Sequence, residues 1–147
     1  MATGTFDIIH PGHGHYLKQA KQLGGKDSKL IVVIATDKTV EKHKRTPIIG
    51  QEQRLETIAM LKYVDEAYVG DDFDPFKIVK KIKPDIIAIG PDQKFIPEKL
   101  KQQLKQVGID VDVIKVNDYK KGELDSTCKI IKKIKKTEFH PDTFRSC

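Results

Sequence analysis

The chain contains no tryptophan, only two cysteines and no long hydrophobic run. Two cysteines, Cys128 and Cys147, cannot form the disulfide framework of a small secreted protein, so we expect a cytoplasmic location. No apolar stretch approaches the ~18 residues of a membrane-spanning helix. Met1 leads directly into the first motif, so we expect no signal peptide. These absences predict a protein with no membrane partner.

Aromatic residues are scarce, at 7% of the chain, and they are not interleaved with basic residues. A surface that stacks nucleic-acid bases needs such interleaving, so we expect no nucleic-acid partner. The 27 Lys and Arg residues exceed the 21 Asp and Glu residues, which gives a net charge of +6. A mildly basic protein suits small anionic substrates, because a positive cleft attracts and concentrates them.

Short runs rich in Val and Ile alternate with helical patterns along the whole chain. We expect strands over Leu30–Ala35, Ala67–Val69, Asp85–Ile89 and Val111–Val116. We expect helices over Gly12–Leu23, Gln51–Leu61, Pro75–Ile82 and Pro97–Gln106, and a last helix capped by Asp125 or Ser126. This alternation predicts an α/β fold in which helices cover both faces of a mostly parallel sheet.

The chain reads as one domain over residues 1–136, followed by a C-terminal tail over 137–147. A first strand has to fit into Met1–Thr3, which is short and leads us to expect further residues upstream. Ligands of such sheets bind beyond the carboxyl ends of the strands. Residues 4–13, the loop after Ala35 and the loop after Ile89 all follow such ends, so we expect the functional site there.

The strongest functional signal lies in one of these segments, Gly4-Thr5-Phe6-Asp7-Ile8-Ile9-His10-Pro11-Gly12-His13. Pro11 suits the first position of a helix, which places His10 at the cap, where Ser, Thr, Asp or Asn would serve the helix better. His10 and His13 project from the same side of a helix N-terminus, and such a terminus binds phosphate. The pair is suited to stabilise charge on a phosphate in transfer. Two ordinary surface histidines are the alternative.

This segment resembles the G-[ST]-F-D-x-x-H-x-G-H signature of the cytidylyltransferase-like nucleotidyltransferases. The resemblance implies a single-domain, Rossmann-like three-layer sandwich whose five strands lie in the order 3-2-1-4-5. It also implies transfer of a nucleoside monophosphate from a nucleoside triphosphate to a phosphorylated acceptor, with release of pyrophosphate. His10 and His13 would then be catalytic, and would bind the nucleotide together with Thr5 and Phe6.

Several positions match family elements that bind the acceptor. Asp37 follows a predicted strand and is expected to orient the acceptor or to brace a loop through hydrogen bonds, with a simple turn aspartate as the alternative. The basic residues after it fall in a stretch with little periodicity, which we interpret as a loop. Lys44 is our choice for a catalytic lysine that contacts the phosphates of both substrates, with Lys42 or Arg45 as the alternatives.

Arg54 is expected to bind the acceptor as well. It lies in the first turn of a predicted helix, where the helix dipole disfavours a cation, so an anionic partner is expected. The family has an E-x-R element at this place, which favours a phosphate as that partner. A salt bridge to Glu52 or Glu56 is the alternative.

Two later segments are expected to hold the rest of the nucleotide. Asp92, in the turn Gly90–Gln93, is placed to accept a hydrogen bond from the ribose or the base, with a plain Pro-Asp turn as the alternative. Ser126 and Thr127 begin a helix and resemble the family's hydroxyl-rich phosphate-binding motif. A simple helix cap has the same pattern. Asp125 departs from the motif, because the family has a small hydroxyl residue there.

No residue resembles a nucleophile or a general base, which fits direct in-line attack by the acceptor phosphate. Fixed positive charge near the expected triphosphate is sparse, so we expect a divalent metal ion such as Mg²⁺ as cofactor. Cys128 directly follows Thr127 at the start of a helix. We expect either a reactive thiol beside the triphosphate, regulated by oxidation together with Cys147, or an apolar filler residue.

Within the family the chain looks like the archaeal FAD synthases, in its His-Pro-Gly-His opening, its Pro-Ile-Ile stretch, its Gly-x-Asp-Gln turn and its two C-terminal cysteines. This resemblance implies ATP as donor and FMN as the phosphorylated acceptor, with transfer of AMP. A glycerol-3-phosphate cytidylyltransferase that uses CTP, and an adenylyltransferase for a sugar phosphate, are the enzyme alternatives. A nucleotide sensor and an RNA-binding domain are the non-enzyme alternatives. A homodimer remains an assembly to test.

Overall fold

The computed structural model describes residues 1–43, 45–118 and 121–140, and in these residues five strands form one sheet. The strands are β1 (Ala2–Gly4), β2 (Ile31–Ile34), β3 (Glu66–Val69), β4 (Ile86–Ile89) and β5 (Asp112–Lys115). All neighbouring strands run parallel, in the order β3-β2-β1-β4-β5. The predicted α/β class, strand number and strand order are therefore confirmed.

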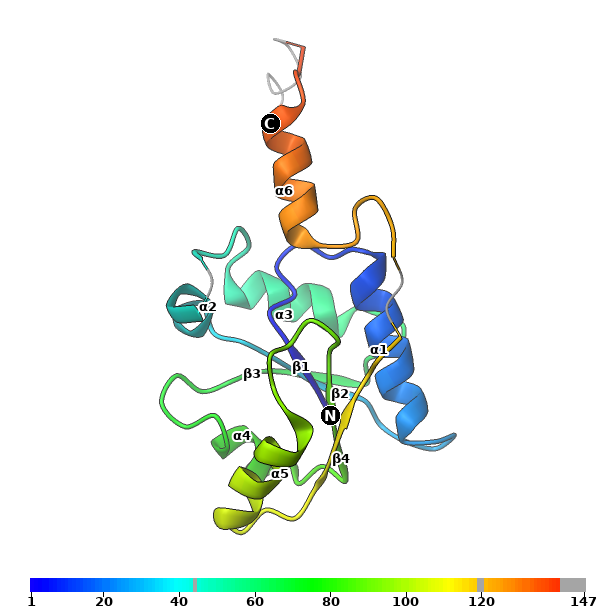
Figure 1. Ribbon diagram of the computed structural model, residues 1–147, viewed down its shortest axis with the longest axis vertical. Coiled ribbons are helices and arrows are strands. Elements are labelled where there is room, and N and C mark those ends of the chain that lie inside the picture. The colour runs from blue at the N-terminus through cyan, green and yellow to red at the C-terminus, as the bar shows by residue number, and fades with distance from the viewer. Residues whose placement is uncertain (44, 119–120, 141–147) are drawn as a thin grey trace.

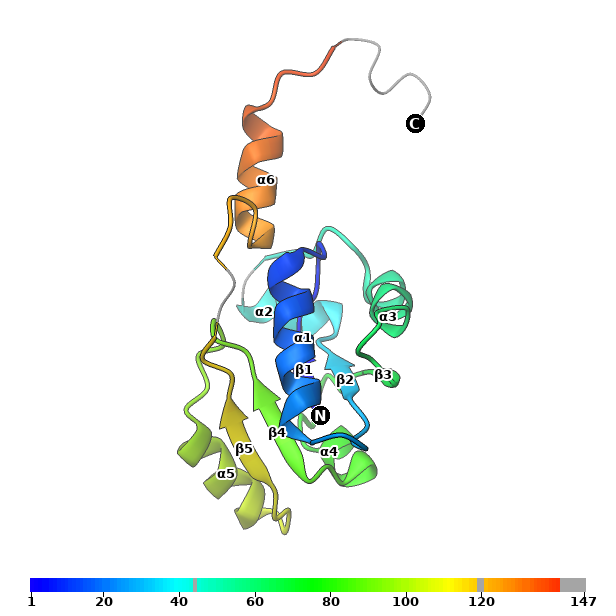
Figure 2. The same ribbon diagram turned by 90° about the vertical axis from the view of Figure 1, so that its right-hand side faces the viewer.

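Helices cover both faces of this sheet, as Figures 1 and 2 show. They are α1 (Pro11–Leu23), α2 (Asp37–His43), α3 (Gln51–Ala59), α4 (Lys77–Ile82), α5 (Pro97–Gln106) and α6 (Thr127–Lys136). One core cluster packs α1 and α3 against the sheet through Leu17 and Ile58. A second cluster packs α4 and α5 through Val79 and Leu104. These two cores make the three layers of the predicted sandwich.

The three-residue strand β1 lies at the centre of the sheet. Residues 2–4 pair with Val32–Ile34 of β2, and Ala2 pairs with Ala88 of β4. The backbone N–H of Ala88 also donates to the carbonyl oxygen of Met1 at 2.8 Å. Because β1 is flanked on both sides, the turn that follows it emerges in the middle of the carboxyl edge of the sheet.

Helix α2 corrects one prediction, because Lys42 and His43 were expected in a loop and instead end this helix. Its start has a local cause that the hydrophobic pattern does not reveal. The hydroxyl oxygen of Thr36 accepts a hydrogen bond from the backbone N–H of Thr39 at 3.1 Å, which caps the helix. A single residue of α2, Val40, is buried, so the helix has almost no apolar periodicity.

The last helix, α6, projects away from the sandwich, as Figures 1 and 2 show. Ser126 is its cap, because the Ser126 hydroxyl accepts a hydrogen bond from the backbone N–H of Lys129 at 3.3 Å. The division into a domain over 1–136 and a tail over 137–147 stays a prediction, and Cys147 lies outside the described residues. Within the part of the chain that the structure describes, no helix is long and apolar enough to span a bilayer.

Candidate active site

The turn that follows β1 is conformationally strained at Phe6. This residue has a φ of 52°, which a bulky side chain rarely adopts. Its ring is 2% exposed and lies against His13 and Tyr16, with centroid distances of 5.1 and 6.4 Å. A Cβ on Gly4 would lie 2.7 Å from this ring, so glycine is required there. Phe6 is thus a core residue that shapes the turn, which leaves only its backbone for the predicted nucleotide contact.

His10 and His13 lie together at the N-terminus of α1. The helix begins at Pro11, and the His10 side chain makes no capping hydrogen bond. The two imidazole rings are stacked with their centroids 3.7 Å apart. Atom Nδ1 of His10 is buried without a hydrogen-bond partner among the described residues, which is typical of a group that binds a ligand.

The electrostatics of His10 favour its neutral form. Burial lowers the pKa of His10, and this outweighs the opposite effect of the Asp125 and Asp92 carboxylates. A neutral imidazole donates through one ring nitrogen and accepts through the other. The ring is therefore able to donate a hydrogen bond to a phosphate oxygen without carrying a permanent charge.

Asp7, for which no role was predicted, lies in the turn between β1 and α1 (residues 5–10), which we call the histidine turn. It holds the loop before α3 against this turn. Its carboxylate accepts hydrogen bonds from the backbone N–H groups of Ile48 at 3.0 Å and Ile49 at 2.8 Å. It also forms an ion pair with Arg45 at 2.6 Å. Burial alone would raise the pKa of Asp7, but these N–H groups and Arg45 together hold it below its usual range.

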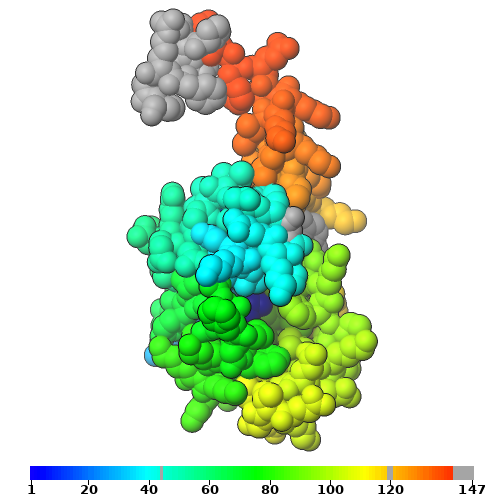
Figure 3. All heavy atoms as spheres, turned by 90° about the vertical axis from the view of Figure 1, so that its left-hand side faces the viewer, coloured from blue at the N-terminus to red at the C-terminus, as the bar shows by residue number. Residues whose placement is uncertain are grey.

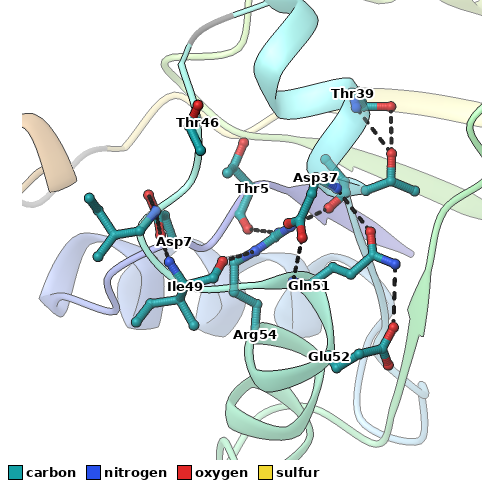
Figure 4. A network of polar contacts seen from close by, with 12 residues as sticks. Thr5, Asp7, Asp37, Thr39, Thr46, Ile49, Gln51, Glu52 and Arg54 are labelled. Atoms are coloured by element: carbon teal, nitrogen blue, oxygen red, sulfur yellow. Dashed lines mark hydrogen bonds and ion pairs between the residues drawn. The ribbon is translucent and has the colours of Figure 1, made fainter.

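Arg54 connects three segments of the site, as Figure 4 shows. Its guanidinium donates to the carbonyl oxygens of Thr5 at 2.6 Å, Ala35 at 2.8 Å and Ile49 at 2.9 Å. It also pairs with the carboxylate of Asp37 at 2.7 Å. The end of β1, the end of β2 and the loop before α3 are thus fixed to one side chain.

The partner of Arg54 is Asp37, so the alternative prediction of a salt bridge to Glu52 or Glu56 is wrong. Asp37 is held a second time by Gln51: its Oδ2 accepts from the Gln51 backbone N–H, and its own N–H donates to Gln51 Oε1. The Arg54 side chain is 0% exposed. This structure therefore gives Arg54 a positioning role through Asp37 and offers an acceptor no direct access to it.

The basic residues expected beside Asp37 are described only in part. Lys44, our choice for the catalytic lysine, lies outside the described residues. Lys42 is exposed in the last turn of α2. Arg45 is already paired with Asp7. The assignment of the catalytic lysine therefore stays a prediction.

On the other side of β1, Gln93 fixes the turn after β4. Its backbone N–H donates to the Gly90 carbonyl oxygen at 3.1 Å, and its Oε1 accepts from the Gly90 N–H at 2.6 Å. Its Nε2 donates to the carbonyl oxygen of Thr3 at 3.2 Å, and its own carbonyl oxygen accepts from Lys115 at 3.2 Å. These contacts confirm the predicted turn and place Asp92 on it as an exposed residue.

The start of α6 lies against the histidine turn. The hydroxyl of Thr127 donates to the carbonyl oxygen of Ile8 at 3.4 Å. A Cβ on Gly12 would lie 3.0 Å from the carbonyl oxygen of Asp125, so glycine permits this close approach. The Asp125 carboxylate is nearly buried and pairs with Lys129 at 2.6 Å. The residue that departs from the family pattern is thus bound within its own segment.

A hollow is visible on the face that Figure 3 shows. Dark-blue N-terminal residues are visible at its floor, between cyan α2, the green segment after β3 and the yellow-green segment after β4. The N-termini of α1 and α6 meet beside the two histidines, and helix N-termini bind phosphate. Residues 1–43, 45–118 and 121–140 contain no group of three or more His, Cys, Asp or Glu side chains that could hold a metal ion.

A fold of this strand order, with paired histidines at a helix N-terminus, matches a known family. The family described as cytidylyltransferase-like matches residues 1–133, so the chain belongs to this family. A protein named FAD synthase from Methanosphaera stadtmanae is 63% identical over 147 residues, which cover 100% of this chain and 99% of that protein. A FAD synthase from Methanothermobacter marburgensis is 59% identical, over 100% of this chain and 91% of that protein.

A solved structure supports the same fold. It is the lipopolysaccharide core biosynthesis protein from Thermoplasma volcanium GSS1, which is 43% identical and aligns with a TM-score of 0.77. The alignment covers 82% of this chain and 96% of that chain. The family and the Rossmann-like architecture expected from the sequence are both confirmed.

Proposed function

We propose that the protein transfers AMP from ATP to FMN, which forms FAD and releases pyrophosphate. Four relatives named FAD synthase support this activity, because they are between 57% and 63% identical over 100% of this chain. The observation that carries the proposal is the stacked pair of His10 and His13 at the N-terminus of α1. There the α-phosphate of a bound nucleotide meets both imidazoles at the positive end of the helix dipole.

The transfer is a single in-line displacement. A phosphate oxygen of FMN attacks the α-phosphorus of ATP, the new P–O bond forms, and the bond to the pyrophosphate oxygen breaks. The acceptor phosphate is largely ionised at neutral pH, so no side chain has to remove a proton. The enzyme acts by positioning and by stabilising the charge that develops on the transferred group.

Each predicted residue takes one role in this reaction. His10 and His13 donate to the α-phosphate, and Ser126 and Thr127 hold the outer phosphates at the start of α6. Asp92 accepts from the ribose, and the backbone at Thr5 and Phe6 lines the nucleotide. Asp37 and Lys44 orient the acceptor phosphate, while Arg54 holds Asp37 in place. These roles are our proposals for named side chains.

We expect a divalent cation to arrive with the triphosphate. In nucleotide-using sites Mg²⁺ keeps several waters and is bound by substrate phosphates with only one or two carboxylates. The described residues hold no group of three or more His, Cys, Asp or Glu side chains that could bind a metal ion, so such a cation would be held mainly by the phosphates of the nucleotide. When bound, the cation neutralises charge on the pyrophosphate as it leaves.

A substrate panel tests the activity. The purified protein is incubated with ATP or CTP, and with FMN, glycerol 3-phosphate or a sugar phosphate, and the products are separated. We expect FAD from ATP and FMN. Accumulation of CDP-glycerol, with no FAD in any reaction, would replace the proposal by the cytidylyltransferase alternative.

The histidine roles are tested by His13→Ala. Loss of a hydrogen-bond donor to the transition state lowers turnover on the order of a hundredfold or more. Circular dichroism establishes that the variant is folded. Near-normal turnover in a folded His13→Ala protein would remove His13 from the mechanism.

A further inference from the structure

Two phenylalanines are exposed on the loops that follow the carboxyl ends of two different strands of the sheet. Phe73 follows β3 and is 92% exposed, and Phe95 follows β4 and is 54% exposed. A single exposed apolar residue is ordinary on a protein surface. Phe73, however, is the most exposed large hydrophobic side chain in the described residues, and its loop has further features that point to a ligand.

The loop that carries Phe73 is held in one conformation by its own side chains. Oδ1 of Asp71 accepts hydrogen bonds from the backbone N–H groups of Phe73 at 2.9 Å and Asp74 at 3.1 Å. Oδ2 of Asp71 forms an ion pair with Lys77 at 2.8 Å. The backbone under Phe73 is therefore fixed before any ligand binds, which lowers the entropy cost of using this ring as a contact.

The same loop is joined by an ion pair to α2, the helix that begins with the proposed acceptor residue Asp37. Asp72, the residue before Phe73, forms an ion pair with Lys38 at 3.4 Å, and Lys38 follows Asp37 in α2. Asp37, Lys38, Asp72 and residues 50–53 line an open surface pocket of about 620 Å³. This pocket lies next to the Asp37 carboxylate that Arg54 positions.

The two loops lie on opposite sides of the central strand. Phe73 follows β3, beyond β2, whereas Phe95 follows β4, on the other side of β1. The predicted nucleotide contacts at Asp92 and Thr127 come from the β4 and α6 side. In Figure 3 the green segment after β3 and the yellow-green segment after β4 form different parts of the rim of the hollow. The proposed nucleotide roles therefore leave the β3 side for the acceptor.

We infer that Phe73 stacks on the flat tricyclic ring of FMN and thereby selects a flavin phosphate over acceptors without a ring. This inference rests on the proposed function and assigns its acceptor specificity to one side chain. Stacked aromatic rings attract each other beyond the burial of their area, and glycerol 3-phosphate gains nothing from this contact.

Binding of FMN to the full-length protein tests the inference without chemistry. FMN is titrated by its intrinsic fluorescence, which stacking on an aromatic side chain quenches, against wild type, Phe73→Ala, Phe73→Tyr and Phe95→Ala. We expect Phe73→Ala to raise the Kd for FMN about three- to tenfold, from the strength of an aromatic pair, and to reduce the quenching. Phe73→Tyr should restore both, and Phe95→Ala is the matched control that leaves both unchanged.

Steady-state kinetics adds a second readout. Phe73→Ala should raise KM for FMN and leave KM for ATP unchanged, and its melting temperature should stay within about 2 °C of wild type because the side chain is exposed. An unchanged Kd in Phe73→Ala, or an equal weakening in Phe95→Ala, would overturn the inference while the proposed function stands. A wild-type protein that binds no FMN would overturn both.

Discussion

Replacement of Arg54 by methionine gives a large and calculable loss of stability. The methionine fills similar space but leaves three part-buried carbonyl oxygens and the Asp37 carboxylate without their donor. Each carbonyl oxygen that loses its donor costs about 1 kcal/mol, the low end of the range because the contacts are part-buried, so the three together cost about 3 kcal/mol. Asp37 is 37% exposed, so water compensates part of its loss. We therefore expect a decrease of about 3–5 kcal/mol in the free energy of unfolding.

Urea unfolding followed by circular dichroism measures this change, which for a chain of this length corresponds to a melting temperature about 10 °C lower. Arg54→Lys should recover little, because an ammonium cannot bridge three carbonyl oxygens as a guanidinium does. Gln53→Met, at an exposed position of the same helix, is the control and should stay within about 0.5 kcal/mol. If Arg54→Met kept its stability and lost only FMN binding, Arg54 would contact the acceptor directly and the positioning role would be wrong.

Three further changes test other parts of the site. Tyr16→Phe removes the hydroxyl that donates to the Ala88 carbonyl oxygen at 2.8 Å, and should cost about 1–2 kcal/mol in urea unfolding; no loss would contradict the contact. Asp7→Asn should cost about 1–3 kcal/mol at neutral pH; since the folded-state pKa of Asp7 is lowered, its stabilisation is lost as pH falls below 3.8, so variant and wild type should converge in acid. The folded-state pKa of His10 lies below the unfolded value of 6.5, so the unfolded chain binds the proton first and stability falls as pH drops through 6.5. His10→Gln should reduce this pH dependence between pH 7.5 and 5.5, and an identical slope in both proteins would refute the assignment.

The fold was largely predictable because its elements carry strong local signals. The helix over Pro97–Gln106 agrees at both ends, since proline suits its first position and Gly108, with a φ of 79°, follows its end. Apolar β-branched residues define β2 in the same way. Helix α2 was missed because it is short and buries only Val40, so its formation depends on the Thr36 cap.

The site was predictable where its contacts are local and not where they are distant. His10 and His13 are three residues apart, and helical geometry alone brings them together. The bond between Arg54 and Asp37 joins residues 17 apart, and that between Asp7 and Ile48 joins residues 41 apart. Such pairs are set by the packing of whole elements, which no spacing in the sequence encodes. The burial of Arg54 was not predictable either: the residue was expected to bind the acceptor, but its side chain is buried and binds protein groups.

The central claim is a direct, single displacement at the α-phosphorus of ATP, assisted by His10 and His13. It is tested by the stereochemistry of that phosphorus. The protein is incubated with FMN and ATP that is chiral at the α-phosphate through sulfur or oxygen-isotope substitution, and the configuration of the FAD produced is determined. One in-line displacement predicts inversion. Retention would require two displacements through a covalent intermediate on the enzyme, and would contradict the account.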